Sequence, residues 1–131
     1  MRRTMIFPAV LLAMFALAGC GGDDDTATDP AASADGDADL TVLAEDISFP
    51  QDTYTADAGE VEVSYQNVGT IRHTLLVRDA EGNDIGDFEL DVSSNGDVDQ
   101  GSVDVEPGQY EFYCDVAGHE AAGMVADFVV E

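Results

Sequence analysis

Near the end of the sequence, Cys114, His119 and Met124 lie in one short segment, with four residues between each and the next. The chain has two histidines, and the other one is His73. The remaining methionines lie near the N-terminus, at Met1, Met5 and Met14. Thiolate, imidazole and thioether groups suit soft and borderline metals, whereas oxygen-rich ligand sets suit magnesium or calcium. Two histidines and one cysteine with a weak axial methionine form the ligand set of a blue-copper site, so these residue types predict copper.

Each of these residues also has a common role without a metal. His73 begins an apolar stretch, and by itself it would be expected as a hydrogen-bonded strand residue. Met124 by itself would be expected in the core, and a lone cysteine is often a buried, inert small hydrophobe. The set is more specific than its members, because it contains every soft donor outside the N-terminal segment. Zinc is a weaker alternative, because zinc sites are built from cysteine, histidine and carboxylates rather than methionine.

Residues 1–19 have the pattern of an export signal. Arg2 and Arg3 supply positive charge, and an apolar run from residue 6 to 17 leads to the small-residue sequence Leu-Ala-Gly before Cys20. This segment resembles the lipobox of bacterial lipoproteins. The resemblance implies that Cys20 carries lipid, becomes the mature N-terminus and anchors the exported protein to the extracytoplasmic face of a membrane. Two acyl chains suffice for stable anchoring. An uncleaved membrane span is disfavoured, because crossing a bilayer needs roughly 20 apolar residues.

Residues 20–39 combine the lipidated cysteine with an acidic segment that is expected to be disordered. The segment is rich in Gly, Ala, Thr and Asp and has no aromatic residue, so it cannot bury a core. A flexible tether of this length would span roughly 25 Å, and a purely solubilising spacer explains the composition equally well. With Cys20 acylated, Cys114 is the remaining cysteine and no internal disulfide can form. Metal binding would keep this single thiol occupied in an oxidising compartment.

Residues 40–131 are long enough for one small domain and too short for two. Short apolar or alternating stretches recur between turn signals, at residues 40–47, 61–66, 73–78, 85–90, 98–105, 109–114 and 125–130. In one of them, Val61, Val63 and Tyr65 alternate with polar residues, as in a half-buried strand. No sustained helical period appears. The pattern predicts an all-β fold, an antiparallel Greek-key β-sandwich.

Several stretches of this domain resemble the cupredoxins, the blue-copper proteins of the plastocyanin, azurin, rusticyanin and halocyanin kind. They are, in order, Ile-Ser-Phe-Pro at 47–50, Ala-Gly-Glu-Val at 58–61, Asn-Val-Gly at 67–69 before His73, and Pro-Gly-Gln-Tyr-Glu-Phe-Tyr-Cys at 107–114. The resemblance implies one type 1 copper bound by His73, Cys114, His119 and Met124. The loop spacing is similar to that of rusticyanin rather than to the shorter loop of plastocyanin.

The resemblance also implies how the site is surrounded. The edge of the His119 ring is expected to reach the surface amid small apolar side chains, namely Val116, Ala117, Ala121 and Ala122. The family often has asparagine directly after the first histidine, where its side chain ties the two ligand segments together. Here Thr74 takes that place, so the tie and the reduction potential are not expected to follow the family pattern.

The mature chain is strongly acidic. All 28 carboxylate residues follow Cys20, where the basic residues are Arg72 and Arg78, so two positive charges less 28 negative charges give a formal side-chain charge of −26. Such a charge disfavours nucleic acid and anionic partners. It favours steering to a basic docking patch, for example on a cytochrome or an oxidase. Adaptation of the surface to high salt explains the absence of lysine equally well.

The absence of common catalytic motifs disfavours an enzyme. The sequence has no Gly-x-Ser-x-Gly elbow, no glycine-rich phosphate loop and no histidine left for a second copper centre. We therefore expect a monomeric, membrane-anchored blue-copper protein that carries single electrons between redox partners. The alternative is a copper-binding lipoprotein that captures copper or delivers it to an oxidase.

Overall fold

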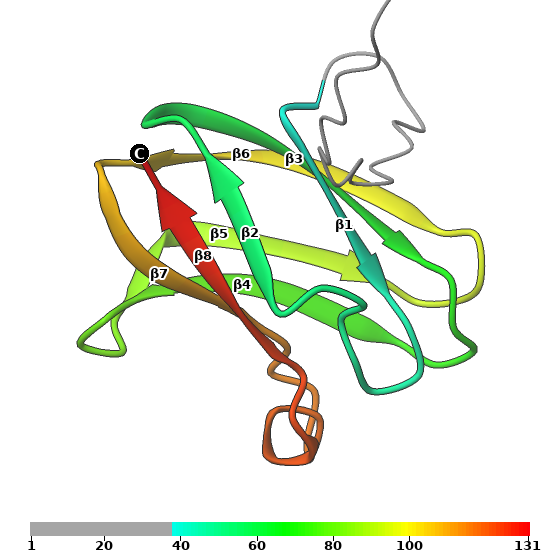
Figure 1. The fold of residues 1–131 in the computed structure, drawn as a ribbon. Helices are drawn as coiled ribbons and strands as arrows, with labels where there is room; N and C mark the ends of the chain where they lie inside the picture. The colour runs from blue at the N-terminus through cyan, green and yellow to red at the C-terminus, as the bar shows by residue number, and fades with distance from the viewer. Residues whose placement is uncertain (1–37) are drawn as a thin grey trace, which may run out of the picture.

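The computed structural model of the chain describes residues 38–131, so the expected export signal, Cys20 and nearly all of the expected tether lie outside the described part. The described residues form eight strands and one short 3₁₀ helix (Figure 1). In chain order these are β1 (Leu40–Ala44), β2 (Thr53–Ala56), β3 (Gly59–Asn67), β4 (His73–Asp79), β5 (Asp84–Val92), β6 (Val98–Val105), β7 (Gly108–Tyr113), η1 (Glu120–Ala122) and β8 (Val125–Val130). No helix among residues 38–131 is long and apolar enough to cross a membrane.

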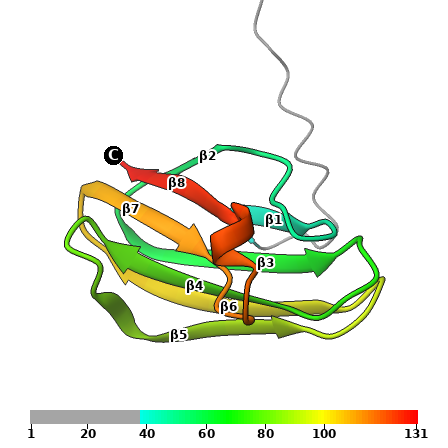
Figure 2. The same ribbon diagram turned by 90° about the horizontal axis from the view of Figure 1, so that it is seen from below.

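The strands form two sheets that lie face to face, which confirms the predicted β-sandwich (Figures 1 and 2). One sheet has the order β1-β3-β6 and the other the order β2-β8-β7-β4-β5. Four pairs are antiparallel, namely β3 with β6, β4 with β5, β4 with β7 and β7 with β8. Two pairs are parallel, β1 with β3 and β2 with β8. β1 and β2 follow each other in the chain but belong to different sheets, so residues 45–52 cross from one layer to the other.

The first strand is shorter than the predicted range of 40–47. It ends at Ala44, because the Glu45 N–H donates to the carbonyl oxygen of Ser48 at 2.9 Å and closes a tight turn. Ile47 in this turn has a positive φ of 65°, which is rare for a β-branched residue and incompatible with a continuing strand. β2 was not predicted at all, because only Tyr54 of its four residues is buried and no apolar alternation marks it.

The core lies between the two sheets and follows the predicted alternation. On β3, Val61, Val63 and Tyr65 are buried while Glu60 and Glu62 are exposed or half-buried. Phe112 on β7 and Phe128 on β8 are fully buried, and their stacked ring centroids are 4.5 Å apart. Burying a side chain of this size stabilises a fold by about 1.5–3 kcal/mol. The core therefore fixes β7 and its neighbours, which are the strands whose ends carry the candidate ligands.

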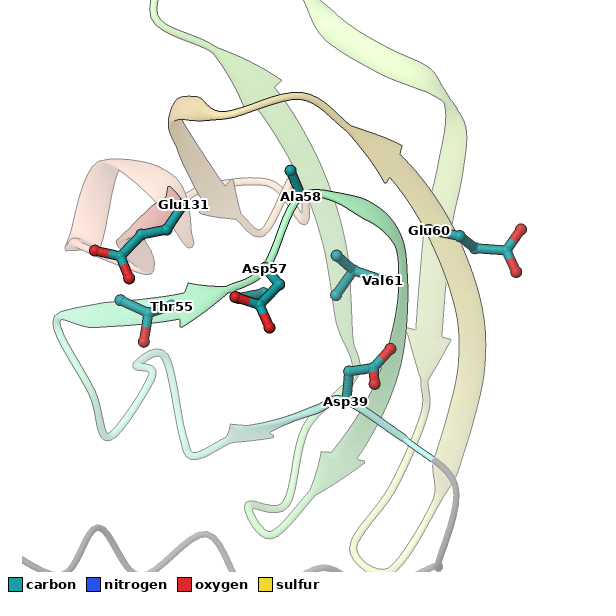
Figure 3. A pocket seen from close by; sticks show the side chains of 8 residues that line it. Asp39, Thr55, Asp57, Ala58, Glu60, Val61 and Glu131 are labelled. Atoms are coloured by element: carbon teal, nitrogen blue, oxygen red, sulfur yellow. The ribbon is translucent and has the colours of Figure 1, made fainter.

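The two ends of the sandwich differ in character. At one end β4 begins with His73, Cys114 follows β7, and Met124 precedes β8. β8 runs from there to the C-terminus at the other end, where the Ala58 N–H donates to the carbonyl oxygen of Glu131 at 2.9 Å. A shallow hollow of about 400 Å³ lies there (Figure 3). Its charged lining consists of Asp39, Asp57, Glu60 and Glu131. The far end is thus acidic, and the soft donors gather at the other.

Candidate metal centre

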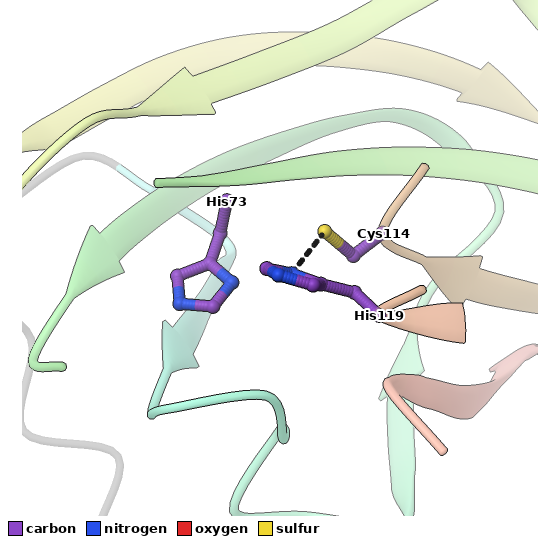
Figure 4. A group of neighbouring side chains, drawn as sticks. All are labelled: His73, Cys114 and His119. Atoms are coloured by element: carbon purple, nitrogen blue, oxygen red, sulfur yellow. Dashed lines mark hydrogen bonds between the residues drawn. The ribbon is translucent and has the colours of Figure 1, made fainter. Parts of the chain in front are cut away.

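Three of the sequence-predicted ligands meet at one point of the structure. The donor atoms of His73, Cys114 and His119 all lie within 4.8 Å of one another. Figure 4 shows the three side chains converging, His73 from the start of β4 and Cys114 and His119 from the segment between β7 and β8. The Cys114 Sγ atom is 3.5 Å from His119 Nδ1, and the two imidazole centroids are 5.1 Å apart. A single small ion can therefore contact all three side chains.

The His73 ring is the strongest indication that the cluster is a metal site. The residue is fully buried, and neither of its ring nitrogens has a hydrogen-bond partner among the described residues. A buried polar atom without a partner costs about 1–3 kcal/mol, so native structures seldom leave one without a reason. Burial lowers the pKa of His73, and the neighbouring His119 lowers it further. The neutral ring is therefore favoured, and it has the free lone pair that a metal requires.

Met124 is held beside this cluster through its backbone. Its side chain is fully buried. The Cys114 N–H donates to the Met124 carbonyl oxygen at 3.2 Å, and the Met124 N–H donates to the His119 carbonyl oxygen at 3.0 Å. Gly123 makes this possible with a φ of 103°, because a left-handed residue ends η1 and turns the chain back toward the sheet. The structure thus places all four sequence-predicted ligands at the same end of the sandwich.

Thr74 ties the two ligand segments together, although the family often has asparagine at this position. The Thr74 backbone N–H donates to Cys114 Sγ at 3.4 Å. The Thr74 hydroxyl donates to Asp115 Oδ1 at 2.7 Å and accepts from the Asp115 backbone N–H at 3.0 Å. β4 and the segment after β7 are therefore joined beside the sulfur. Sequence reasoning missed Asp115, whose position next to Cys114 was the available signal.

Asn67 is a second residue whose role only the structure reveals. It is fully buried at the end of β3. Its side-chain amide donates to the carbonyl oxygens of Ile71 at 2.6 Å and Val92 at 3.3 Å, and its Oδ1 accepts from the Gly69 N–H at 2.9 Å. These bonds fix the loop of residues 68–72 that leads directly into His73. The Asn-Val-Gly motif seen in the sequence is therefore a structural support of the site.

Arg78 anchors the ligand loop, the segment of residues 114–124 between β7 and β8. Its guanidinium donates to Glu111 on β7 and to Glu120 in η1, both at 2.7 Å, and it lies over the Tyr113 ring at 4.6 Å from the centroid. The arginine side chain is 21% exposed, so it links two strands and the turn that follows His119. Sequence reasoning counted Arg78 only as a charge.

His119 lies at the edge of the buried cluster. It is 9% exposed, whereas His73 is 0% exposed. Around it on the loop, Ala117, Ala121 and Ala122 are exposed and Val116 is half-buried, as the sequence predicted. Ile47, Val68 and Ile71 are also exposed on the two loops that pack against each other before His73. The surface at the ligand end therefore carries exposed apolar side chains, beside the exposed carboxylates Asp46, Asp115 and Glu120.

Solved structures that resemble this one share its fold. An auracyanin from the photosynthetic bacterium Roseiflexus castenholzii aligns with a TM-score of 0.61 and 17% identity, covering 70% of this chain and 95% of its own. Auracyanin A, a blue copper protein from Chloroflexus aurantiacus, aligns with a TM-score of 0.59 and 16% identity, covering 70% and 96%. An azurin from Methylomonas sp. strain J gives 0.58 and 12%, covering 70% and 95%.

The comparison of sequences gives the family. No curated protein matches the chain at a significant level. The profile of the copper binding proteins of the plastocyanin/azurin family, however, matches residues 37–131, which is the whole of the described domain. The soft donor set gathered at one end of the sandwich is the kind of site that such a family uses. The chain belongs to the plastocyanin/azurin family of copper-binding proteins.

Proposed function

We propose that this protein carries single electrons through one mononuclear type 1 copper bound by His73, Cys114, His119 and Met124. The observation that carries the proposal is the buried cluster of three donors within 4.8 Å, in which both His73 nitrogens lack a hydrogen-bond partner among residues 38–131. Bound copper would supply a one-electron couple between Cu(I) and Cu(II). The Cys114 thiolate would be the strong donor, the two imidazoles would be the further close donors, and the Met124 thioether would be a weak ligand.

The chain's own contribution is a rigid set of donors. Cys114 and His73 are held at strand ends by the core, and Thr74 and Asn67 fix the segments that carry them. Ligands held in this way move little when the charge of the site changes, and a small rearrangement favours fast electron transfer. His119 is the ligand nearest to the surface, so its ring is the proposed point of entry and exit.

We propose a carrier rather than an enzyme because the four side chains leave no evident position for a substrate. A copper centre that activates a substrate needs an open coordination position, as catalytic zinc sites do. The buried cluster lies among closely packed strand ends, and the apolar surface near His119 suits contact with another protein. The proposed activity is therefore exchange of electrons across a transient protein contact.

The charge distribution defines the proposed partner. Residues 38–131 hold 22 carboxylate residues and two arginines. Both arginines pair with carboxylates, Arg72 with Asp91 and Arg78 with Glu111 and Glu120. A redox protein such as a cytochrome or an oxidase with a basic docking patch would complement this surface, and the association rate would fall as salt is added.

We also propose that the protein is exported and held at the extracytoplasmic face of a membrane by lipid on Cys20. The support is the charged, apolar and small-residue pattern that precedes this cysteine. The acidic segment between Cys20 and β1 would tether the copper domain near the membrane. The domain would then meet membrane-bound partners without crossing the bilayer.

The test is to add Cu(II) to the protein and to record its visible absorption and electron paramagnetic resonance spectra. An intense thiolate-to-copper band with small copper hyperfine splitting is expected, followed by reversible one-electron reduction. Cys114→Ser should abolish the band. Met124→Leu should keep the band, because a thioether is only a weak ligand, and it should raise the reduction potential. A colourless protein that hands its copper to an acceptor would instead support copper delivery.

A further inference from the structure

The Thr74 hydroxyl has one proton and two neighbours that could receive it. Asp115 Oδ1 is 2.7 Å from the Thr74 oxygen, and Cys114 Sγ is 3.6 Å from it. The Asp115 backbone N–H donates to the same oxygen at 3.0 Å and so occupies one of its lone pairs. Thr74 is 1% exposed, so the hydroxyl interacts with protein groups. Its orientation is therefore set by the competition between the carboxylate and the sulfur.

The distances favour the carboxylate. An O–H donor forms short, strong bonds to a charged carboxylate, typically at about 2.5–2.7 Å, and the Thr74–Asp115 distance lies at that limit. The contact to the sulfur is almost 1 Å longer. When the hydroxyl proton points toward the carboxylate, it is not available to the Cys114 sulfur. The donor from Thr74 to Cys114 Sγ is then its backbone N–H, at 3.4 Å.

The backbone around Thr74 is fixed, so the hydroxyl cannot easily leave this position. The Tyr65 hydroxyl donates to the Thr74 carbonyl oxygen at 3.2 Å inside the core. Burial raises the pKa of Tyr65, so this donor keeps its proton. On the other side, Thr74 pairs in register with Asp91 of β5. The motion that remains to the Thr74 hydroxyl group is rotation of its hydrogen about the C–O bond.

We propose that Asp115 holds the Thr74 hydroxyl proton away from the Cys114 sulfur and thereby keeps the reduction potential of the site low. This inference rests on the proposed copper site. A hydrogen bond to a ligating thiolate withdraws electron density from the sulfur and favours the reduced state, and such bonds tune the potential of sites of this kind. Asp115 removes one such bond and adds a negative charge that favours Cu(II). Thr74 and Asp115 thus act through Cys114, without binding the metal.

The test compares Asp115→Asn with the parent in the copper-loaded full chain. The asparagine amide can donate to the Thr74 oxygen, which frees the hydroxyl proton for the sulfur. We expect the equilibrium between Cu(II) and Cu(I) to shift about tenfold toward Cu(I), which equals about 59 mV for a one-electron couple. The thiolate-to-copper band should move to higher energy. A purely structural role of Asp115 would lower stability without moving the band in this direction.

The control is the same substitution in a Thr74→Val background, where no hydroxyl proton exists. There Asp115→Asn should give only a smaller shift that weakens as salt is added, since it reflects charge alone. Thr74→Ser keeps the proton and should behave as the parent does. An equal shift with and without the hydroxyl would overturn the proposal, as would a blue protein whose potential is unchanged by Asp115→Asn.

A second measurement covers the case in which Thr74→Val does not fold. In the diamagnetic Cu(I) form of the parent, the Thr74 hydroxyl proton should give a slowly exchanging nuclear magnetic resonance signal that is coupled to the Asp115 carboxyl carbon. Detection of that coupling in the parent would support the proposal. A hydroxyl proton directed at the sulfur in the parent would overturn it. A parent that forms no blue site would instead contradict the proposed function, so the two failures are distinguishable.

Discussion

The two imidazoles of the cluster have different surroundings. His73 is fully buried at the first position of β4, whereas His119 lies on the ligand loop and is 9% exposed. The segment before His73 is fixed by the buried Asn67. The exposed alanines beside His119 leave its ring close to solvent. A small molecule can therefore reach the position of one imidazole and not that of the other.

This difference predicts the effect of removing each ring. His119→Gly should bind copper in an altered site, and added imidazole should restore the blue band by entering from the surface. His73→Gly is the matched control, because its ring position is enclosed by the core and the 68–72 loop. Imidazole should restore its band much less at the same concentration. A titration of each variant with imidazole, followed by visible absorption, checks this, and equal recovery would contradict the assigned accessibility.

Among the elements, the loop between β3 and β4 determines where His73 lies. Gly69 in this loop packs directly on the turn after β1, and its N–H donates to the Ala44 carbonyl oxygen at 3.2 Å. Next to it, the Thr70 N–H and hydroxyl donate to Asp46 Oδ1 at 2.7 and 3.0 Å. The turn after β1 and the loop before His73 therefore move together. A change at their contact should alter the position of His73 and so the metal centre.

Gly69→Ala should separate these two loops. A β-carbon at this position would lie 2.7 Å from Asp46 Oδ1 and 2.9 Å from backbone atoms of Asp46 and Glu45. Because backbone atoms cannot give way cheaply, we expect a loss of about 1–3 kcal/mol of unfolding free energy, the usual range for overpacking. Denaturant unfolding measures the loss, and the blue band should broaden or shift.

Gly108→Ala provides the control, because the nearest atom to its added β-carbon is the end of the Tyr110 ring at 3.4 Å. It should cost clearly less than Gly69→Ala and leave the blue band unchanged. Equal losses for the two variants would show that the contact between the loops is not what makes Gly69 necessary.

At the scale of the whole molecule, the carboxylates far outnumber the basic side chains. The described residues contain 22 acidic residues and two arginines. The edge strand β5 alone exposes Asp84, Asp87, Glu89 and Asp91. Charges on an edge strand oppose pairing with another molecule, but like charges across the surface also oppose the compact state. Salt screens this repulsion, with a Debye length of about 10 Å at 0.1 M.

The melting temperature should therefore rise with sodium chloride between low and molar concentration. The matched control is the double variant Asp87→Lys and Glu89→Lys, which changes two exposed positions of β5 and reduces the net negative charge. Its melting temperature should be higher at low salt and should depend less on salt. Calorimetry of both proteins across the same salt series checks this. A parent whose stability does not change with salt would show that self-repulsion is negligible.

The proposed anchor is also a property of the whole molecule. Cys20→Ser removes the thiol to which lipid would be attached and leaves residues 38–131 unchanged. Produced in a bacterial host that processes lipoproteins, the parent should sediment with membranes, and the variant should appear in the soluble fraction. The blue band of the variant should equal that of the parent, which shows that the copper domain itself is intact. A variant that still sediments with membranes would remove the basis for lipid anchoring.

The sequence by itself was sufficient to predict the fold class, because alternation such as Val61, Val63 and Tyr65 follows from the geometry of a half-buried strand. It also identified the candidate ligands, because the chain outside its N-terminal segment contains few soft donors. Few alternative ligand sets could therefore be formed from them. β2 escaped prediction, because an edge strand with one buried side chain has no apolar pattern. The parallel pairing of β1 with β3 and of β2 with β8 was also beyond the pattern, which does not specify partners.

Only the tertiary structure decided how the site is supported. Thr74 and Asp115 are 41 positions apart in the chain, and their hydrogen bonds exist because β4 and β7 are neighbours in one sheet. Arg78 and Glu120 meet for the same reason. The type of each ligand is a property of a single residue, so it can be read directly from the sequence. The direction of a hydroxyl proton beside a sulfur depends on the distances between segments far apart in the chain, and only the folded packing sets those distances.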